Sequence, residues 1–313
     1  MSPNDSFLGG LELPRVLHLS DAEYNALVGE RQTHLKACLK SPKHASVYKK
    51  SNSLQRGSWF DAMAKVGIEK FQKTVAIIPD INKASNKGKS SYVDFLIEHG
   101  WKYKGSQNEN EWRVLAYKQL NSSAWNKGKE LIPASDWSDL RFMYDSLMNY
   151  EMAQIIMDHS EHNLCLQWDS KDEELPFEYR VWKCQFDFSW KEDSKTNGID
   201  LKTDIDPSPE AFQKKVFDLG YDFQAAFYMK GLEECGINPG IWLWIAVETK
   251  EPWTTHVHYA TPETIEIGWR RVQMAVDKLK SYLKDDKKRP YGTKVNHIKP
   301  PRWLDYQLKE YGY

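Results

Sequence analysis

Two kinds of segment alternate along the chain. In the first kind, apolar residues recur every three or four positions. In the second kind, a shorter run is apolar almost throughout. The helical spacing predicts helices over residues 22–40, 53–72, 135–159 and 262–284. The short runs predict strands over residues 73–79, 163–168, 178–190, 241–249 and 254–260. The run IWLWIAVET at 241–249 is typical of a central strand buried on both faces. Together these elements predict the α/β class.

Two further helices are predicted between residues 208 and 235. The first begins at Ser208, where a serine cap precedes a proline in the first turn. Apolar residues follow at helical spacing as far as Phe227, and Gly220 is expected to separate the two helices. On the second helix, Gln224 and Tyr228 are four positions apart and therefore share a face.

The segment CQFDFSWKEDSKTNGIDLKTD at 184–204 carries the candidate chemistry. The turn-forming residues at 196–198 predict a β-hairpin whose second strand begins near Ile199. Since alternate residues share a face of a strand, Asp200 and Lys202 should point into one cleft while Leu201 enters the core. The same hairpin brings Asp187, at the end of the aromatic run, to this site.

Two carboxylates and one lysine on neighbouring strands suit cleavage of phosphodiester bonds. Mg²⁺ prefers one or two carboxylates together with waters and phosphate oxygens, and a lysine can orient the attacking water. The Asp-x-Lys tripeptide also occurs elsewhere in the chain, in charge-rich segments that are typical of solvated loops. A surface salt bridge on a β-hairpin would account for the same residues.

The residues around this hairpin resemble a known family. GIDLKTDIDPSPEAFQKKVFDLGYDFQAAFYMKGLEECG is similar to a segment of the RecE-type phage exonucleases (exonuclease VIII-like), in the RecB-like branch of the PD-(D/E)xK nuclease superfamily. That segment has an Asp-x-Lys-Thr-Thr strand and a Gln-x-Ala-Phe-Tyr helix. VWKCQFDF resembles the family's strand that ends in the first metal-binding acid. LKACLKSPKHASVYKK, GSWFDAM and PPRWLDY resemble further family elements, so the similarity spans roughly residues 30 to 306.

The resemblance implies a PD-(D/E)xK nuclease core, a central mixed β-sheet flanked by helices, with helical N-terminal decoration. It implies that Asp187, Asp200 and the Leu201 carbonyl hold the metal ions. Asp61 stands where the family has a histidine expected to face the metal, and it remains a candidate ligand. Lys202 would position the hydrolytic water. The resemblance places Gln224 and Tyr228 beside the site, where either residue could instead be structural.

The resemblance also implies how DNA is held. We expect Thr33, Lys40 and Ser41 to contact a 5′ phosphate of the DNA. Arg302 and Trp303 are two further residues expected to contact DNA. Two segments rich in lysine and arginine, 31–56 and 278–302, would border the acidic centre, because phosphate contacts give affinity without reading sequence. Solvated helix faces would show the same charge pattern.

The implied activity is Mg²⁺-dependent 5′ to 3′ digestion of linear double-stranded DNA, with Mn²⁺ as a possible substitute. The product would be 3′ single-stranded overhangs for a RecT-like annealing protein in phage-type recombination. A homo-oligomeric ring of three or four subunits is implied. Two alternatives remain open, an endonuclease of the same superfamily with a restriction or repair role, and a catalytically inactive DNA-binding module.

Length, charge and cysteine spacing limit the remaining possibilities. The chain has 313 residues, of which 41% are hydrophobic, which is enough for one large core. We expect an N-terminal arm (1–20) and a single exonuclease domain (21–313). This domain is divided into a helical part (21–160), a catalytic core (161–284) and a basic tail (285–313), and residues 101–134 are interpreted as an insertion.

The formal net charge of −1 argues against a protein that coats nucleic acid indiscriminately. Four cysteines without C-x-x-C spacing give no support for a zinc ribbon or an iron–sulfur cluster. The N-terminal sequence lacks the pattern of a signal peptide, so we expect a soluble cytoplasmic protein.

Overall fold

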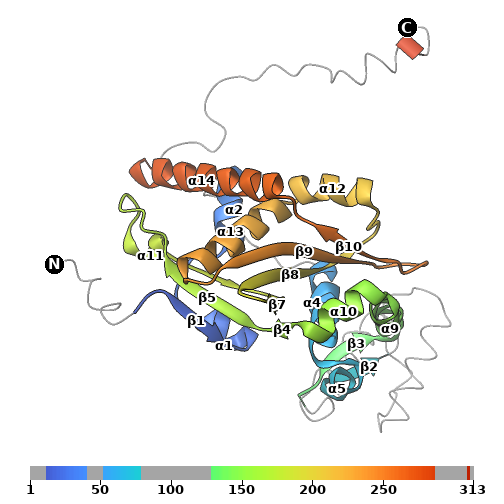
Figure 1. Cartoon of the computed structure of the whole chain (residues 1–313). Coiled ribbons are helices and arrows are strands. Elements are labelled where there is room, and N and C mark those ends of the chain that lie inside the picture. The colour runs from blue at the N-terminus through green and yellow to red at the C-terminus, as the bar shows by residue number, and fades with distance from the viewer. Residues whose placement is uncertain (1–11, 41–51, 79–127, 286–308, 311–313) are drawn as a thin grey trace, which may run out of the picture.

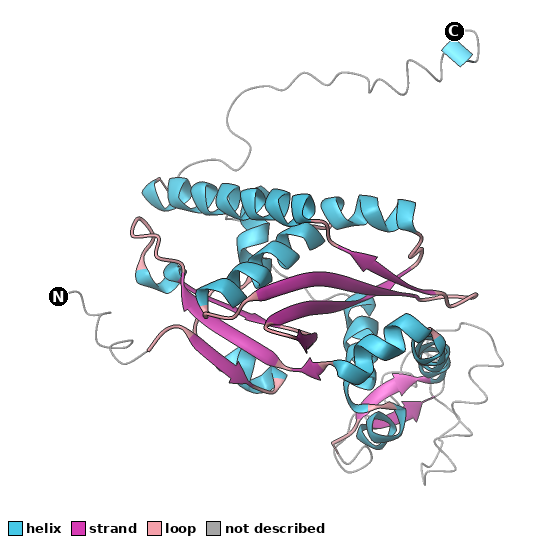
Figure 2. Cartoon of the chain, in the orientation of Figure 1, coloured by secondary structure: helices cyan, strands magenta, loops and turns pink. Residues whose placement is uncertain are grey.

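The computed structural model describes residues 12–40, 52–78, 128–285 and 309–310, and it is built around a five-stranded sheet (Figures 1 and 2). The strand order is β10 (Thr255–Tyr259), β9 (Pro239–Glu248), β8 (Lys195–Asp204), β7 (Phe188–Glu192) and β4 (Glu161–His162). β8 and β9 pair in parallel, whereas the other neighbours are antiparallel. The predicted α/β fold with a central mixed sheet flanked by helices is therefore confirmed.

Helices cover both faces of this sheet (Figure 1). One face packs against α2 (Gln32–Lys40), α12 (Pro209–Asp218), α13 (Tyr221–Glu234) and α14 (Pro262–Lys284). The other packs against α4 (Asn52–Val66), α9 (Ala134–Asn149) and α10 (Glu151–His159). Because successive side chains of a strand point to opposite faces of the sheet, a hydrophobic core lies on each face. In β9, Trp242 and Trp244 enter the first core, while Leu243 and Ile245 enter the second.

Two smaller sheets and three short helices complete the described structure. β1 (Arg15–His18), β5 (Leu164–Asp169) and β6 (Val181–Gln185) form an antiparallel sheet in that order. β2 (Val75–Ile78) and β3 (Glu130–Pro133) pair in parallel. The short helices are α1 (Asp21–Ala26), α5 (Ile68–Thr74) and α11 (Phe177–Arg180). Within the described ranges, no helix is both long and apolar enough to cross a membrane.

Several predicted elements are interrupted in the structure. The helix predicted over 22–40 is two helices, α1 and α2. The helix over 53–72 breaks at Gly67, whose φ of +83° is in the left-handed region that favours glycine. The helix over 135–159 breaks at Tyr150, whose backbone is extended. The segment predicted as an N-terminal arm contains β1, because its residues 15–18 pair with β5. The predicted insertion 101–134 lies mostly outside the described residues.

The hairpin around the candidate site differs from the prediction in its turn. β7 and β8 pair from Phe188 opposite Ile199 outward, so the hairpin itself is confirmed, but its turn lies around Asp193, at a φ of +52°. Residues 196–198 belong to β8. Gly198 is required there by packing, since a Cβ at this position would lie 2.4 Å from the ring of Trp242. The turn signal in the sequence therefore came from a close contact within the sheet.

The elements after the hairpin follow the prediction. α14 spans Pro262–Lys284 as expected, and the Thr261 side chain accepts a hydrogen bond from the backbone N–H of Thr264 at its start. Gly220 separates α12 from α13 with a φ of +70°. This break fixes the direction of α13, whose first turns lie over the centre of β8.

Candidate active site

Asp200 and Lys202 on β8 face α13 and form a closed polar triangle with Gln224 of that helix. The Lys202 Nζ lies 2.5 Å from Asp200 Oδ2 and donates a hydrogen bond to Gln224 Oε1 at 3.1 Å. Gln224 Nε2 in turn donates to Asp200 Oδ1 at 2.7 Å. Leu201 points the opposite way and packs in the second core. The strand alternation and helix spacing predicted from sequence thus bring these three polar side chains together.

Asp187 joins this site from a break between two strands. The segment 178–190, predicted as one strand, is α11, β6 and β7, and Asp187 lies in the two-residue gap after β6. Its Oδ2 accepts a hydrogen bond from the backbone N–H of Leu201 at 3.1 Å. The gap lets β6 pair in one sheet and β7 in another, so the acid stands where the two sheets meet.

Burial and like charge oppose the ionisation of Asp200. Only 2% of this residue is exposed, and burial is the main reason that its pKa rises to about 6, with a further increase from Asp187. The cation of Lys202 acts in the opposite direction. A carboxyl with this pKa is mostly ionised at neutral pH, and below about pH 6 it would bind a divalent cation with release of its proton.

Lys202 remains a cation in this setting. Burial alone would lower its pKa, but the carboxylates of Asp200 and Asp187 raise the pKa above its usual value. Its Nζ also lies 4.8 Å from the centre of the Tyr221 ring, a geometry that favours the charged form. At neutral pH Lys202 can therefore donate hydrogen bonds to a water or a phosphate oxygen, but it is not a general base.

Asp61 on α4 adds a third carboxyl near Asp187. Its Oδ2 accepts from Lys65 Nζ at 2.7 Å one helical turn later, while its Oδ1 is buried and has no hydrogen-bond donor in the described part of the chain. Burial, and then the charge of Asp187, raise the pKa of Asp61 to about 7, although Lys65 lowers it. A buried carboxylate oxygen without a donor is costly, and a cation would satisfy it.

These carboxyls fit a hard divalent cation. Across the described residues, no three His, Cys, Asp or Glu side chains are placed to hold a metal on their own. Mg²⁺ does not need such a cage, because it usually keeps several waters and takes one or two carboxylates together with substrate phosphates. The pair Asp187 and Asp200, with Asp61 nearby, matches that requirement.

Tyr228 lies behind the site instead of in it. It is 8% exposed, and its ring packs edge-on against Phe186 and Trp242, with centroid distances of 5.1 and 5.5 Å. Burial raises its pKa well above the usual value, so the phenol stays neutral. Gln224 thus supplies the polar contact of α13, and Tyr228 supports the core one turn later.

The residues predicted to bind DNA are only partly described. Thr33 is exposed on α2 and accepts a hydrogen bond from Gln32 Nε2, and Lys40 is exposed at the end of the same helix. Ser41, Arg302 and Trp303 lie outside the described residues. Some basic side chains of the two bordering segments already have acidic partners. Arg56 pairs with Asp136 and Asp139, Lys280 with Asp172, and Lys284 with Glu174.

Two residues beside the site were not singled out from sequence. Tyr221 begins α13 and places its ring under the Lys202 cation. Lys36 on α2 donates from Nζ to the Leu219 carbonyl at 2.9 Å, and burial, with Lys202 next, lowers its pKa to about 8. In the sequence Lys36 was one cation among many, and Tyr221 was one of many aromatics. The contact of Lys65 with Asp61, in contrast, could have been predicted from the sequence, because the two residues are four positions apart on a helix.

Comparisons with known proteins bear on this arrangement. The model of a family described as a PDDEXK-like domain of unknown function (DUF3799) matches residues 39–301, a range that includes Asp61 and the polar triangle. The crystal structure of a "putative exonuclease" from Eubacterium rectale is similar, with a TM-score of 0.51 and 12% sequence identity over 93% of this chain and 98% of that chain. At this identity the likeness shows the fold alone. No curated protein sequence matches.

Proposed function

We propose, since this chain belongs to the PDDEXK-like domain family (DUF3799), that its site hydrolyses phosphodiester bonds in DNA. The family match and the fold agree with the PD-(D/E)xK nuclease superfamily predicted from sequence, and the narrower RecE-type assignment is part of our proposal. The observation that carries it is the meeting of Asp187 and the Asp200–Lys202–Gln224 triangle where α13 crosses the β7–β8 hairpin.

The side chains have distinct roles in the proposed mechanism. Asp187 and Asp200, with the Leu201 carbonyl and Asp61, would hold Mg²⁺, or Mn²⁺ in its place. When bound, the ion would lower the pKa of a coordinated water and offset the negative charge of the phosphate. Lys202, held as a cation, orients the attacking water or a phosphate oxygen. Gln224 fixes the Asp200 carboxylate and the Lys202 ammonium relative to each other, so that neither is free to rotate away.

In its finer form, the proposal is a 5′ to 3′ exodeoxyribonuclease that acts on linear double-stranded DNA. It would leave 3′ single-stranded overhangs for a RecT-like annealing protein and would work as a homo-oligomeric ring that encloses the duplex. Support comes from the order of family-like segments along the chain. It also comes from a fold shared with a protein described as a "putative exonuclease". Thr33, Lys40, Ser41, Arg302 and Trp303 are the proposed DNA contacts.

One experiment separates the exonuclease from the endonuclease alternative. Purified protein is incubated with an end-labelled linear duplex or a covalently closed plasmid, with Mg²⁺ or with EDTA. We expect loss of the linear DNA from its 5′ ends in Mg²⁺ only, and an intact plasmid. Nicking or linearisation of the plasmid would favour the endonuclease, and binding without hydrolysis of either DNA would favour the inactive module. Light scattering should give a mass well above the 36.6 kDa monomer.

A further inference from the structure

A cavity lies away from the carboxylates of the candidate active site. It has a volume of about 460 Å³ and is formed by α14, the C-terminal half of α13 and the strands β5 and β6. Glu234 on its wall follows Gln224 by ten residues along α13, which corresponds to about 15 Å of helix. The cavity is in the size range of small-molecule sites and is separate from the polar triangle.

Three tryptophans, together with Val272 and Val276, form the apolar part of this cavity. Trp168 and Trp182 are 1% and 5% exposed and make its floor, with centroids 6.2 Å apart and an interplanar angle of 81°. Trp269 on α14 is half-buried and lies 6.4 Å from Trp182 at 65°. The rings therefore form a corner, in which a flat ligand can stack on one ring and contact the edge of another.

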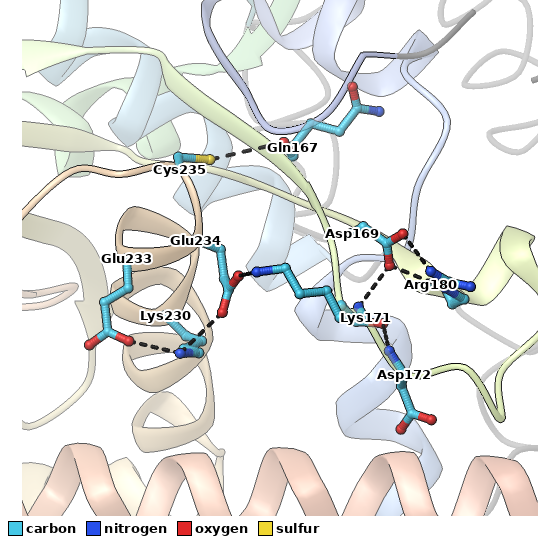
Figure 3. A network of polar contacts seen from close by, with 10 residues as sticks. Gln167, Asp169, Lys171, Asp172, Arg180, Lys230, Glu233, Glu234 and Cys235 are labelled. Carbon is cyan, nitrogen blue, oxygen red and sulfur yellow. Dashed lines mark hydrogen bonds and ion pairs between the residues drawn. The ribbon is translucent and has the colours of Figure 1, made fainter. Parts of the chain in front are cut away.

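Acidic, basic and neutral polar side chains line the rest of the cavity. Figure 3 shows three of them, Asp172, Lys230 and Glu234, within their network of polar contacts. Lys230 ion-pairs with Glu234 at 3.2 Å and places its Nζ 5.9 Å from the centre of the Trp269 ring. Lys280 ion-pairs with Asp172 at 2.7 Å. Gln273 on α14 offers an exposed amide. The wall thus offers both hydrogen-bond donors and hydrogen-bond acceptors.

The lining of this cavity holds three carboxylates, those of Asp172, Glu234 and Asp277, and two lysines, and both lysines are ion-paired with these acids. A simple anion would meet Glu234 and Asp172, and a simple cation would meet Lys230 and Lys280. An aliphatic chain would leave the polar wall without partners. The chemistry therefore favours a neutral, flat ring that carries both donors and acceptors on its edge.

We propose that this cavity binds a nucleobase, stacked on Trp269 and hydrogen-bonded by Lys230, Glu234 and Gln273. The choice of a nucleobase among flat heterocycles rests on the proposed action on DNA. The base could belong to a DNA strand or to a free nucleotide, and the chemistry of recognition is the same. Base stacking on an aromatic side chain tolerates any sequence, as a nuclease without sequence preference requires.

The test measures binding to the full-length protein in EDTA, where no hydrolysis can occur. The ligands are deoxyadenosine, deoxyadenosine monophosphate, deoxyribose 5-phosphate and a short oligodeoxyadenylate. Binding of each ligand is measured by ligand-observed NMR and by calorimetry. We expect the first two and the oligonucleotide to bind and the sugar phosphate not to bind. Equal affinity of mononucleotide and oligonucleotide would identify a free nucleotide, and much tighter binding of the oligonucleotide would identify a strand.

Variants locate the binding at this cavity. Trp269→Leu keeps apolar bulk but removes the flat ring, and it should weaken deoxyadenosine binding about tenfold, while Trp269→Tyr should restore most of it. Tyr259→Leu removes an exposed ring on β10 and should change nothing. If Trp269→Leu does not fold, Gln273→Ala at an exposed position should still weaken binding by about threefold. Deoxyadenosine binding that is unchanged in the Trp269 or Gln273 variants would overturn the proposal.

The experiments distinguish a failure of the cavity proposal from a failure of the proposed nuclease function. A protein that binds deoxyadenosine through Trp269 but cuts no DNA would uphold the cavity and reject the nuclease. A protein that digests linear DNA but binds no nucleoside would reject only the cavity.

Discussion

Replacing Asp61 with asparagine should stabilise the metal-free protein at and above neutral pH. Burial raises the pKa of this carboxyl from 3.8 to about 7, so the folded protein binds a proton there that the unfolded chain has already released. Between about pH 4 and pH 7 the wild type therefore loses stability as the pH rises. Asparagine has no such proton, and the variant should escape this loss.

The size of the effect follows from the shift in pKa. A rise from 3.8 to about 7 is about three units, or about 4 kcal/mol, for a side chain fully shielded from solvent. The Asp61 side chain is 26% exposed, and the substitution also removes its ion pair with Lys65. We therefore discount the gain to about 1–2 kcal/mol at pH 8.

Urea denaturation in EDTA at several values between about pH 5 and pH 8 measures this gain. The difference in free energy of unfolding between Asp61→Asn and wild type should grow with pH. Asp158→Asn, which neutralises an exposed carboxylate on α10, is the matched control and should show no such growth. A constant difference at all pH values, or a destabilised variant at pH 8, would refute the reasoning. In excess Mg²⁺ the gain should shrink, because the variant loses a candidate ligand.

Three further predictions follow from the packing and the site. Gly268→Ala should cost about 2 kcal/mol or more in chemical denaturation, because the new Cβ would lie 2.1 Å from a carbonyl oxygen of α13. Gly57→Ala, where the Cβ meets only an ordinary contact at 3.5 Å, should instead stabilise by up to about 1 kcal/mol. Gln224→Ala should lower kcat about tenfold or more in DNA digestion and leave duplex binding intact, whereas Tyr228→Phe should stay within about twofold of wild type. Mg²⁺ affinity measured by calorimetry should rise between about pH 6 and pH 8 with release of protons, and a flat profile would contradict the raised pKa values of Asp200 and Asp61.

The family resemblance, and not the helix spacing, placed Gln224 beside the strand that carries Asp200 and Lys202. The pairing of Asp200 with Lys202 could be anticipated from local periodicity, because side chains two apart on a strand share a face. The bounds of α14 were accessible for the same reason, since its apolar stripe and its Thr261 cap are both local features.

Features that depend on tertiary pairing were not accessible. The segment around Asp187 is apolar and aromatic on both sides. Its break into β6 and β7 is explained by pairing, because the two strands belong to two separate sheets. Lys36 reaches the site from a distant helix, and the tryptophan corner joins β5, β6 and α14. Gly198 was misread as a turn residue because its contact with Trp242 lies on the neighbouring strand.

The most direct test of the central claim compares two lysines of the same hairpin. Lys202→Ala removes the cation of the polar triangle, and Lys195→Ala removes an exposed lysine from an Asp-x-Lys tripeptide at the turn. Both proteins are assayed for Mg²⁺-dependent loss of an end-labelled linear duplex and for duplex binding in EDTA. We predict that Lys195→Ala digests DNA like the wild type, while Lys202→Ala binds the duplex but does not digest it. Digestion by Lys202→Ala at the wild-type rate would contradict the proposed active site.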